Sequence, residues 1–386
     1  MKVLYCSPVF LDYRLPFFKE LVRLFKGDFY VMYSPMRYKL MNRMDLCNRV
    51  KEELGDNACP FEHDYLFDTA TMSFSKVDGE RGQKIPIVYG LVRAIRRLRP
   101  DIVVTEGFFQ WTPLVVLFGL IFRKPVYISY ERTCHTERNT GRLKRWHRTF
   151  TDKFVGGYLV NGVETQDYLL SIGIEKDKIH IVGMSADSTG LLRGIASMTQ
   201  EEKQTMKGRY VHDDGLIYLF SGQIVERKGV KFLLQAWMEH IDKYKNDTLV
   251  LVGYGDQYES LKESYSGEKS ISFEGKVPYS SMYLYYAIAD VFVLPTIEDN
   301  WSLVVPEAMA CGLPIATSIY NGCHSELVQK DVNGITFDTY KQETIVEALD
   351  YFHHQDLKKM GEASKRLEEP FNTENCAKRF YDILNH

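Results

Sequence analysis

The stretch that most restricts the fold of this chain runs over residues 291–318. It begins with a short apolar run, which is typical of a buried parallel strand. The acidic and amide cluster 298–300 follows, and then a short helix around Glu307 that Gly312 ends. Asp299 and Glu307 therefore flank a tight loop and a helix start, which places two carboxylates and several free N–H groups around one point. Carboxylates accept hydrogen bonds from sugar hydroxyls and helix N-termini attract phosphate, so the stretch favours a nucleotide-sugar ligand.

Length, composition and charge restrict the class of protein. A chain of 386 residues with 45% hydrophobic and 13% aromatic residues is long enough for two or three well-packed domains. The net charge of −3 argues against a nucleic-acid-binding protein. Residues 1–190 carry 28 Lys and Arg against 22 Asp and Glu, whereas residues 191–386 carry 20 against 29. The two halves are therefore expected to meet different partners.

Cysteine usage and hydropathy predict a cytoplasmic protein. The seven cysteines are scattered and form no Cys-x-x-Cys pair, which indicates reduced thiols rather than disulfides or a zinc site. Met1-Lys2 leads directly into a strand-like run, so no signal peptide is expected. The longest apolar run, 111–122, is too short for a bilayer, which needs about 20 residues. It is expected to form a buried helix.

The string Glu307-Ala-Met-Ala-Cys-Gly-Leu-Pro resembles the acidic signature of the retaining GT-B glycosyltransferases of family 4, also called group 1. In that signature a first glutamate lies eight positions before the second. Here the first carboxylate is Asp299, and whether Asp299 or Glu298 faces the sugar is left open. The alternative is an ordinary strand–loop–helix unit with a solvated acidic loop.

The resemblance implies an α/β fold in which two Rossmann-like domains face a cleft. Residues 1–190 are expected to form the acceptor-binding domain and residues 191–369 the nucleotide-sugar-binding domain, with the interdomain region at 188–214. Residues 370–386 are expected to form a helix that crosses back onto the first domain. The strand and helix patterns alternate along the chain, which independently indicates parallel sheets.

A second stretch of the second domain, 221–229, carries a glycine turn between a predicted strand and helix. Lys228 lies close to the helix start, which is a phosphate site by geometry and charge. The stretch resembles the Gly-Arg-Leu-x-x-x-Lys-Gly signature of the family, in which the lysine holds the diphosphate. Gln223 stands at the position of the arginine, and whether Arg227 replaces it is left open.

The remaining expectations for the donor site follow from the resemblance. Glu307 is expected to hold the ribose hydroxyls and Asp299 the sugar hydroxyls, helped by the backbone N–H groups of 300–303. The glycine turn at 253–255 lets the backbone approach the nucleotide, and Val277 is the candidate for a contact with the base. The expected donor-binding residues are Gly222, Gln223, Arg227, Gly253, Gly255, Val277, Glu298, Asn300, Trp301, Ser302 and Leu303.

Candidate residues of the first domain follow the ends of its predicted strands. Relatives place a histidine after the strand that here covers 125–130, and the stretch 131–138 resembles a subgroup that acts in polysaccharide assembly. Glu131 and His135 therefore join Lys228, Asp299 and Glu307 as the expected catalytic residues. The expected acceptor-binding residues are Asp12, Tyr13, Arg14, Glu106, Arg132 and Arg138. The alternatives are a helix cap at 12–14 and a solvated charge cluster at 131–138.

A basic run with interleaved aromatic residues covers 142–150. Its spacing suits contact with a membrane surface or an anionic acceptor. The competing interpretation is a solvated helix face whose Arg and Lys side chains point to water while Trp146 and Phe150 lie in the core.

Together these features predict a hexosyltransferase-type enzyme that moves a sugar, with retention, from a UDP- or GDP-sugar to a saccharide acceptor. The acceptor is expected to be lipid-linked and part of a bacterial surface polysaccharide. No metal and no cofactor is expected, and the protein is expected to lie in the cytoplasm or peripherally at the inner membrane face.

Three alternatives are weighed against this prediction. One is another GT-B enzyme, such as a nucleotide-sugar epimerase or a phosphorylase. Another is a non-catalytic GT-B subunit, which Gln223 favours. A dehydrogenase is disfavoured, because no Gly-x-Gly-x-x-Gly is followed by an acidic ribose ligand about 20 residues later.

Overall fold

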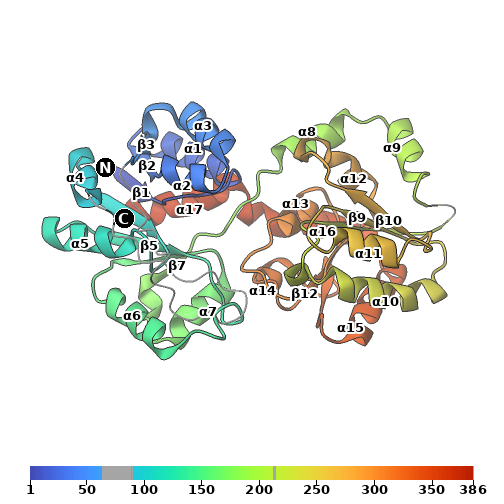
Figure 1. Ribbon diagram of the computed structural model, residues 1–386. Helices are drawn as coiled ribbons and strands as arrows, with labels where there is room; N and C mark the ends of the chain where they lie inside the picture. Colours follow the sequence, from blue (N-terminus) through green and yellow to red (C-terminus); the bar gives the residue numbers. More distant parts are fainter. Residues whose placement is uncertain (63–87, 89, 212–213, 386) are drawn as a thin grey trace.

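The computed structural model of this chain describes residues 1–62, 88, 90–211 and 214–385. It contains two α/β domains, each built around a parallel sheet (Figure 1). The strands of the first sheet are β1 (Val3–Cys6), β2 (Phe29–Tyr33), β3 (Ala58–Pro60), β4 (Ile102–Glu106), β5 (Val126–Tyr130), β6 (Gly157–Val160) and β7 (Ile179–Ile181). Their order is β3-β2-β1-β4-β5-β6-β7. The predicted fold class is thereby confirmed.

Helices cover both faces of the first sheet, because the strands are apolar on both sides. These helices are α1 (Arg14–Leu24), α2 (Pro35–Leu40), α3 (Met44–Leu54), α4 (Leu91–Leu98), α5 (Thr112–Phe122), α6 (Arg142–Asp152) and α7 (Val163–Ser171). The run 87–99 has the pattern of a basic amphipathic helix; α4 lies within it, and residues 87 and 89 lie outside the described residues. Arg99 ends α4 in the left-handed conformation, with φ of 50°, and Pro100 follows.

The second sheet contains six strands, β8 (Ile217–Ser221), β9 (Thr248–Val252), β10 (Ile271–Gly275), β11 (Val291–Leu294), β12 (Ile315–Ser318) and β13 (Gly334–Phe337). Their order is β10-β9-β8-β11-β12-β13. The helices around it are α8 (Thr189–Ser197), α9 (Gln200–Lys207), α10 (Val230–Lys243), α11 (Tyr258–Ser264), α12 (Tyr283–Ile288), α13 (Val304–Ala310), α14 (His324–Leu327), α15 (Gln342–Tyr351) and α16 (Leu357–Glu368). Thr199 and Glu202 form a capping box at the start of α9.

The last helix, α17 (Thr373–Asn385), returns to the first domain, where Figure 1 shows it beside α1. Its apolar face is buried in the core of that domain through Cys376, Ala377, Phe380 and Leu384. Arg379 Nε donates a hydrogen bond to the carbonyl oxygen of Val182, at 3.1 Å. The chain therefore passes from the first domain to the second and back, as the GT-B arrangement predicts.

The apolar run 111–122 differs from its prediction. It forms α5, but Leu117, Leu120 and Ile121 are exposed, so the helix is buried on one face only. The helix has apolar residues on all sides, but only its inner face packs on the sheet. The apolar side chains of its outer face are therefore exposed to solvent. None of the helices in the described parts of the chain has the length and apolar character needed to traverse a bilayer.

Candidate active site

A cavity of about 1180 Å³ lies between the two domains. The first domain contributes Asp12 and Tyr13, which precede α1. The second domain contributes Ser221 at the end of β8, Tyr279, and Glu307 in the first turn of α13. Ligands of doubly wound sheets bind at the carboxyl ends of the strands, so this cavity occupies the expected place for a substrate.

Glu307 faces this cavity and is held by two tyrosines that sequence analysis missed. Its carboxylate accepts hydrogen bonds from the Tyr279 hydroxyl at 2.9 Å and the Tyr286 hydroxyl at 3.2 Å. Enclosure by protein raises the pKa of Glu307 to about 7, although the two hydroxyls act in the opposite direction. A carboxyl group placed this way binds hydroxyl donors such as those of a ribose. The signal available in the sequence was the group of tyrosines between residues 279 and 286.

Lys228 and Asp299 form a buried ion pair. Lys228 Nζ lies 2.5 Å from Asp299 Oδ2 and 3.4 Å from Ser302 Oγ, the residue that precedes α13 by two positions. Arg227 Nη1 lies 3.6 Å from the same Asp299 oxygen. Burial alone would raise the pKa of Asp299, but the Lys228 ammonium group outweighs it and the pKa lies below its usual value. The two cations and the carboxylate predicted from the motifs therefore do meet at one point.

The structure separates the roles of the two neighbouring carboxylates. Glu298 accepts a hydrogen bond from Arg138 Nη1 at 2.8 Å, whereas Lys228 contacts Asp299. Asp299 is thus the carboxylate that faces the cation. Arg138, predicted at the acceptor site, here connects the first domain to the acidic loop of the second.

Two of the backbone N–H groups expected to help with the sugar are engaged within the protein. The N–H of Trp301 donates to Asp299 Oδ1 at 3.2 Å, and the N–H of Ser302 donates to Asn321 Oδ1 at 3.2 Å. The Trp301 ring is buried and its centroid lies 5.5 Å from that of Phe371. These groups fix the shape of the acidic loop, and in this structure they are not free for a ligand.

The glycine turns bring two loops of the second domain into backbone contact. Gly253 has a φ of 145°, and a Cβ added there would lie 1.7 Å from the carbonyl oxygen of Gly222. A Cβ at Gly255 would lie 2.3 Å from the carbonyl oxygen of Ile224. Only glycine allows this approach, so the loops after β8 and β9 form one surface.

Two further donor-site candidates differ in their surroundings. Gln223 Oε1 accepts a hydrogen bond from Arg227 Nη2 at 3.4 Å, which links the substituted position to the alternative cation. Val277 packs against the core of the second domain. Tyr279, two residues further on, lines the cavity that contains Glu307.

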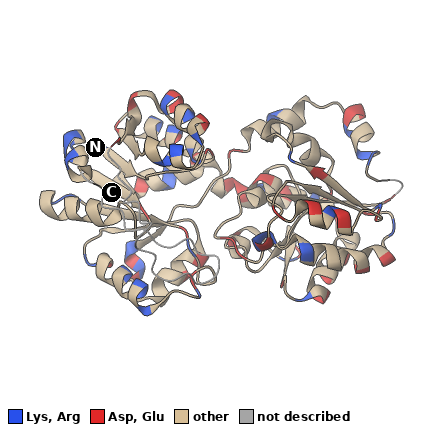
Figure 2. Cartoon of the chain, viewed as in Figure 1, with Lys and Arg blue, Asp and Glu red and all other residues tan. Residues whose placement is uncertain are grey.

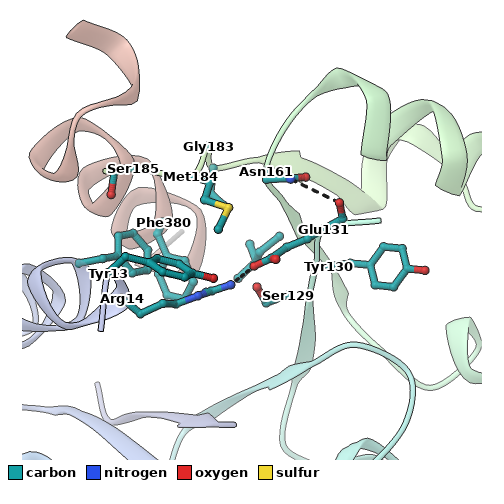
Figure 3. A pocket seen from close by; sticks show the side chains of 13 residues that line it. Tyr13, Arg14, Ser129, Tyr130, Glu131, Asn161, Gly183, Met184, Ser185 and Phe380 are labelled. Carbon is teal, nitrogen blue, oxygen red and sulfur yellow. Dashed lines mark hydrogen bonds and ion pairs between the residues drawn. The ribbon is translucent and has the colours of Figure 1, made fainter. Parts of the chain in front are cut away.

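A second cavity, of about 640 Å³, lies mainly in the first domain and reaches Asn300 of the second. Arg14 is buried at its wall and forms ion pairs with Glu131 and Glu106, the latter at 3.2 Å. Figure 3 shows Arg14 pointing toward Glu131, next to Tyr13 and Ser129. Residues predicted from three separate strand ends thus converge. Tyr13 and Arg132 also line this cavity, whereas Asp12 lines the larger one.

Arg148 differs from its prediction. It was expected on the basic face of the helix over 142–150, but it is buried and donates to Glu137 Oε2 at 2.9 Å. Its guanidinium lies among the rings of Phe108, Tyr130 and Tyr168. Sequence analysis missed this network, because its members come from four separate segments. Trp146 and Phe150 are exposed, which contradicts the competing interpretation that placed them in the core.

The two domains meet along a seam of direct hydrogen bonds beside the acidic loop. His135 Nε2 donates to the carbonyl oxygen of Ile297 at 2.9 Å, and Asn161 Nδ2 lies 3.4 Å from that of Asn300. The N–H of Val163 donates to Glu326 Oε2 at 2.9 Å. His135 therefore lies where the two domains meet, and in this structure it holds the loop that carries Asp299.

The arrangement of domains, cleft and crossing helix defines a GT-B glycosyltransferase fold. The crystal structure of HepE from Anabaena in complex with UDP superimposes over 100% of both chains, with a TM-score of 0.76 and 13% sequence identity. Its complex with UDP-glucose gives a TM-score of 0.72 at 14% identity.

The sequence is also similar to known glycosyltransferases. Residues 202–369 match the family model of the glycosyl transferases group 1. An α-monoglucosyldiacylglycerol synthase of Acholeplasma laidlawii is 27% identical over 310 residues, which are 75% of each chain. A lipopolysaccharide 1,2-N-acetylglucosaminetransferase of Salmonella typhimurium is 28% identical over 194 residues, and the match spans half the length of that relative. Residues 202–369, most of the second domain, are therefore similar to the group 1 glycosyltransferases.

Proposed function

We propose that this chain is a retaining, metal-independent glycosyltransferase that moves a sugar from a UDP- or GDP-sugar to a lipid-linked saccharide acceptor. The observation that carries the proposal is the convergence of Lys228, Arg227 and Asp299 beside the start of α13, whose first turn carries Glu307 at the interdomain cavity.

The donor site works by an exchange of charges. The diphosphate of the donor takes the place of Asp299 as the partner of Lys228, and Arg227 supplies the cation that Gln223 does not. Asp299, released from Lys228, then accepts hydrogen bonds from the sugar hydroxyls. Glu307 accepts hydrogen bonds from the ribose. The UDP and UDP-glucose complexes of HepE support this choice of donor class.

The same cations serve the reaction. As the bond between the sugar and the diphosphate breaks, negative charge grows on the leaving phosphate, where Lys228 and Arg227 lie. Each such preorganised donor lowers the barrier by about 3 kcal/mol. The leaving phosphate oxygen accepts the proton of the incoming acceptor hydroxyl on the same face of the sugar, which retains the configuration without a covalent nucleophile. The side-chain cations supply the charge compensation that a metal provides in other transferases.

The acceptor is assigned to the cavity around Arg14, Glu106 and Glu131, which combines charged groups with aromatic walls. Helix α6 forms part of that wall through Lys144 and Arg148. Its outer face carries Leu143, Trp146 and Phe150, which are 76%, 61% and 45% exposed. Figure 2 shows basic residues on α4 and α6. An apolar stripe flanked by Arg142 and Arg145 suits contact with the surface of an anionic membrane. Helix α6 thereby places the acceptor cavity next to the inner membrane face, where a lipid-linked acceptor can enter it.

A panel of UDP-, GDP-, ADP- and TDP-sugars tests the donor assignment. One nucleotide class is expected to raise the melting temperature by a few degrees at saturating concentration, because it binds only the folded protein. The same donor is expected to be turned over when a lipid-linked saccharide is added. Conversion of the donor to an epimer without acceptor would contradict the proposal, and so would binding without turnover, which would indicate a non-catalytic subunit.

Donor affinity is expected to rise with pH around neutrality, since the pKa of Glu307 is about 7. The ionised carboxylate accepts stronger hydrogen bonds from ribose hydroxyls than the protonated acid does. The donor KM is expected to fall about tenfold between pH 6 and pH 8 in the wild type and to stay flat in Glu307→Gln. Steady-state kinetics at fixed acceptor concentration measures this.

A control separates Glu307 from other groups of similar pKa. The pKa of Glu326 is also raised to about 7 by burial, so Glu326→Gln is expected to keep the pH slope of the wild type. A slope that survives in Glu307→Gln would argue against the ribose role. Without donor the sign is opposite: the contribution of Glu307 to folding stability is full below its ordinary pKa of 4.5 and is lost as the pH rises through about 7.

A further inference from the structure

Three side chains of the kinds that bind metal ions converge near the start of β9, at the opposite end of the second sheet from the donor loops. His240 belongs to α10, Asp247 directly precedes β9, and His353 follows α15. The Nε2 atoms of His240 and His353 lie 3.0 and 2.7 Å from the same oxygen of Asp247, Oδ2. One ligand atom from each side chain lies within 4.8 Å of the other two. Among the described residues, no other group of His, Cys, Asp and Glu side chains converges in this way.

The group is buried and its orientation is fixed from outside. His240 and Asp247 are almost fully buried. Nδ1 of His240 lies 2.6 Å from Asp350 Oδ1, and the N–H of Leu216 donates to Asp247 Oδ1 at 2.8 Å. Carboxylates that receive the second N–H of a ligating histidine, as Asp350 is placed to do, are a regular feature of metal sites, because they fix the ring and its tautomer.

Both ring nitrogens of His240 face carboxylates, Nδ1 that of Asp350 and Nε2 that of Asp247. A neutral imidazole carries one N–H. If Nδ1 donates to Asp350, the lone pair of Nε2 faces the Asp247 carboxylate oxygen at 3.0 Å. A metal ion between these two atoms would bind both lone pairs, with the other nitrogen of His240 held by Asp350.

We propose that His240, Asp247 and His353 bind one Zn²⁺ ion, with water in the fourth position. Two imidazoles and one carboxylate are a donor set that zinc takes, whereas Mg²⁺ and Ca²⁺ favour oxygen ligands. Ligand atoms around zinc lie about 3.3 Å apart, so the distances of 3.0 and 2.7 Å from the two histidines to Asp247 Oδ2 need to lengthen by a few tenths of an ångström. His353 is the most exposed of the three and provides the solvent side for the water.

The zinc would be structural and take no part in sugar transfer. Asp247 precedes β9 and the donor-site Gly253 follows it, so the five residues of the strand separate them by about 16 Å. The ion would instead tie α10, the start of β9 and the turn after α15 to one another. The prediction that transfer needs no metal is unaffected.

Equilibrium dialysis of the full-length, chelator-treated protein against micromolar Zn²⁺, with zinc measured by mass spectrometry, tests the site. One zinc per chain is expected for the wild type. His353→Gln, which removes one ligand at the exposed side of the group, is expected to weaken binding at least tenfold. His354→Gln is the matched control: its side chain lies 3.4 Å from the Tyr244 hydroxyl and outside the group, so it is expected to bind as the wild type does.

Two further measurements complete the test. Zinc is expected to raise the melting temperature of the wild type and of His354→Gln, but not that of His353→Gln, while donor turnover stays unchanged on zinc removal. A wild-type chain that takes up no zinc overturns the proposal. Equal zinc binding by His353→Gln and the wild type overturns it as well.

Discussion

Replacement of Lys228 by alanine is expected to slow sugar transfer roughly a hundredfold or more while the protein remains folded. Lys228 is buried beside Asp299 and lies next to the residues that lead into α13, where the leaving diphosphate is assigned. Loss of one preorganised cation raises the barrier by about 3 kcal/mol, and each 1.36 kcal/mol is about tenfold in rate. Initial rates with donor and acceptor in excess measure the effect, and near-normal turnover would defeat the assignment.

The ion pair itself calls for two controls. Alanine at position 228 leaves the Asp299 carboxylate buried without its partner, which costs about 3–5 kcal/mol of stability. The double variant Lys228→Met/Asp299→Asn removes both charges and is expected to recover most of that stability without recovering transfer. Lys231→Ala removes an exposed lysine from α10, three positions away, and is expected to change neither property.

Removal of three exposed apolar side chains from α6 is expected to reduce binding to anionic vesicles about a hundredfold. Leu143, Trp146 and Phe150 lie on the outer face of the helix, and each is expected to contribute on the order of 1 kcal/mol when it enters the lipid interface. Co-sedimentation of Leu143→Ser/Trp146→Ser/Phe150→Ser with phosphatidylglycerol-containing vesicles measures the change. Transfer to a water-soluble acceptor is expected to persist.

A matched control removes exposed apolar surface elsewhere. Met238 and Val332 of the second domain are also exposed, and Met238→Ser/Val332→Ser is expected to bind vesicles as the wild type does. Retained binding by the triple α6 variant would show that the stripe has another role. Binding should also weaken with salt, because Arg142 and Arg145 flank the stripe.

The sequence predicted those site residues whose position is set by a strand end or a helix start close to them in the chain. Glu307 enters the cavity because it lies in the first turn of a helix that follows a buried strand. Lys228 lies near the same place because a glycine turn ends a neighbouring strand. Both follow from the alternation of strands and helices, which brings all strand ends of a parallel sheet to one edge.

The sequence could not predict which charged side chains, far apart in the chain, form pairs in the folded protein. Nothing local indicates that Asp299 pairs with a lysine 71 positions earlier, or that Glu298 turns toward Arg138 across the cleft. Arg148 occurs in a run of basic residues, and only its contact with Glu137 shows that it faces inward. Charged residues are the least predictable in this respect, because one guanidinium group is stable either in water or beside a buried carboxylate.

The Lys228–Asp299 pair also has a consequence for selectivity among anions. Without donor, the charge of Lys228 is already neutralised by Asp299. Orthophosphate and pyrophosphate are therefore expected to bind weakly, because they must displace Asp299 and form no further contacts. In the proposed donor site a whole nucleotide is expected to gain further contacts, from Glu307 to its ribose and from the glycine loops. The Asp299 carboxylate is therefore expected to let a sugar nucleotide bind while it excludes free phosphate and pyrophosphate.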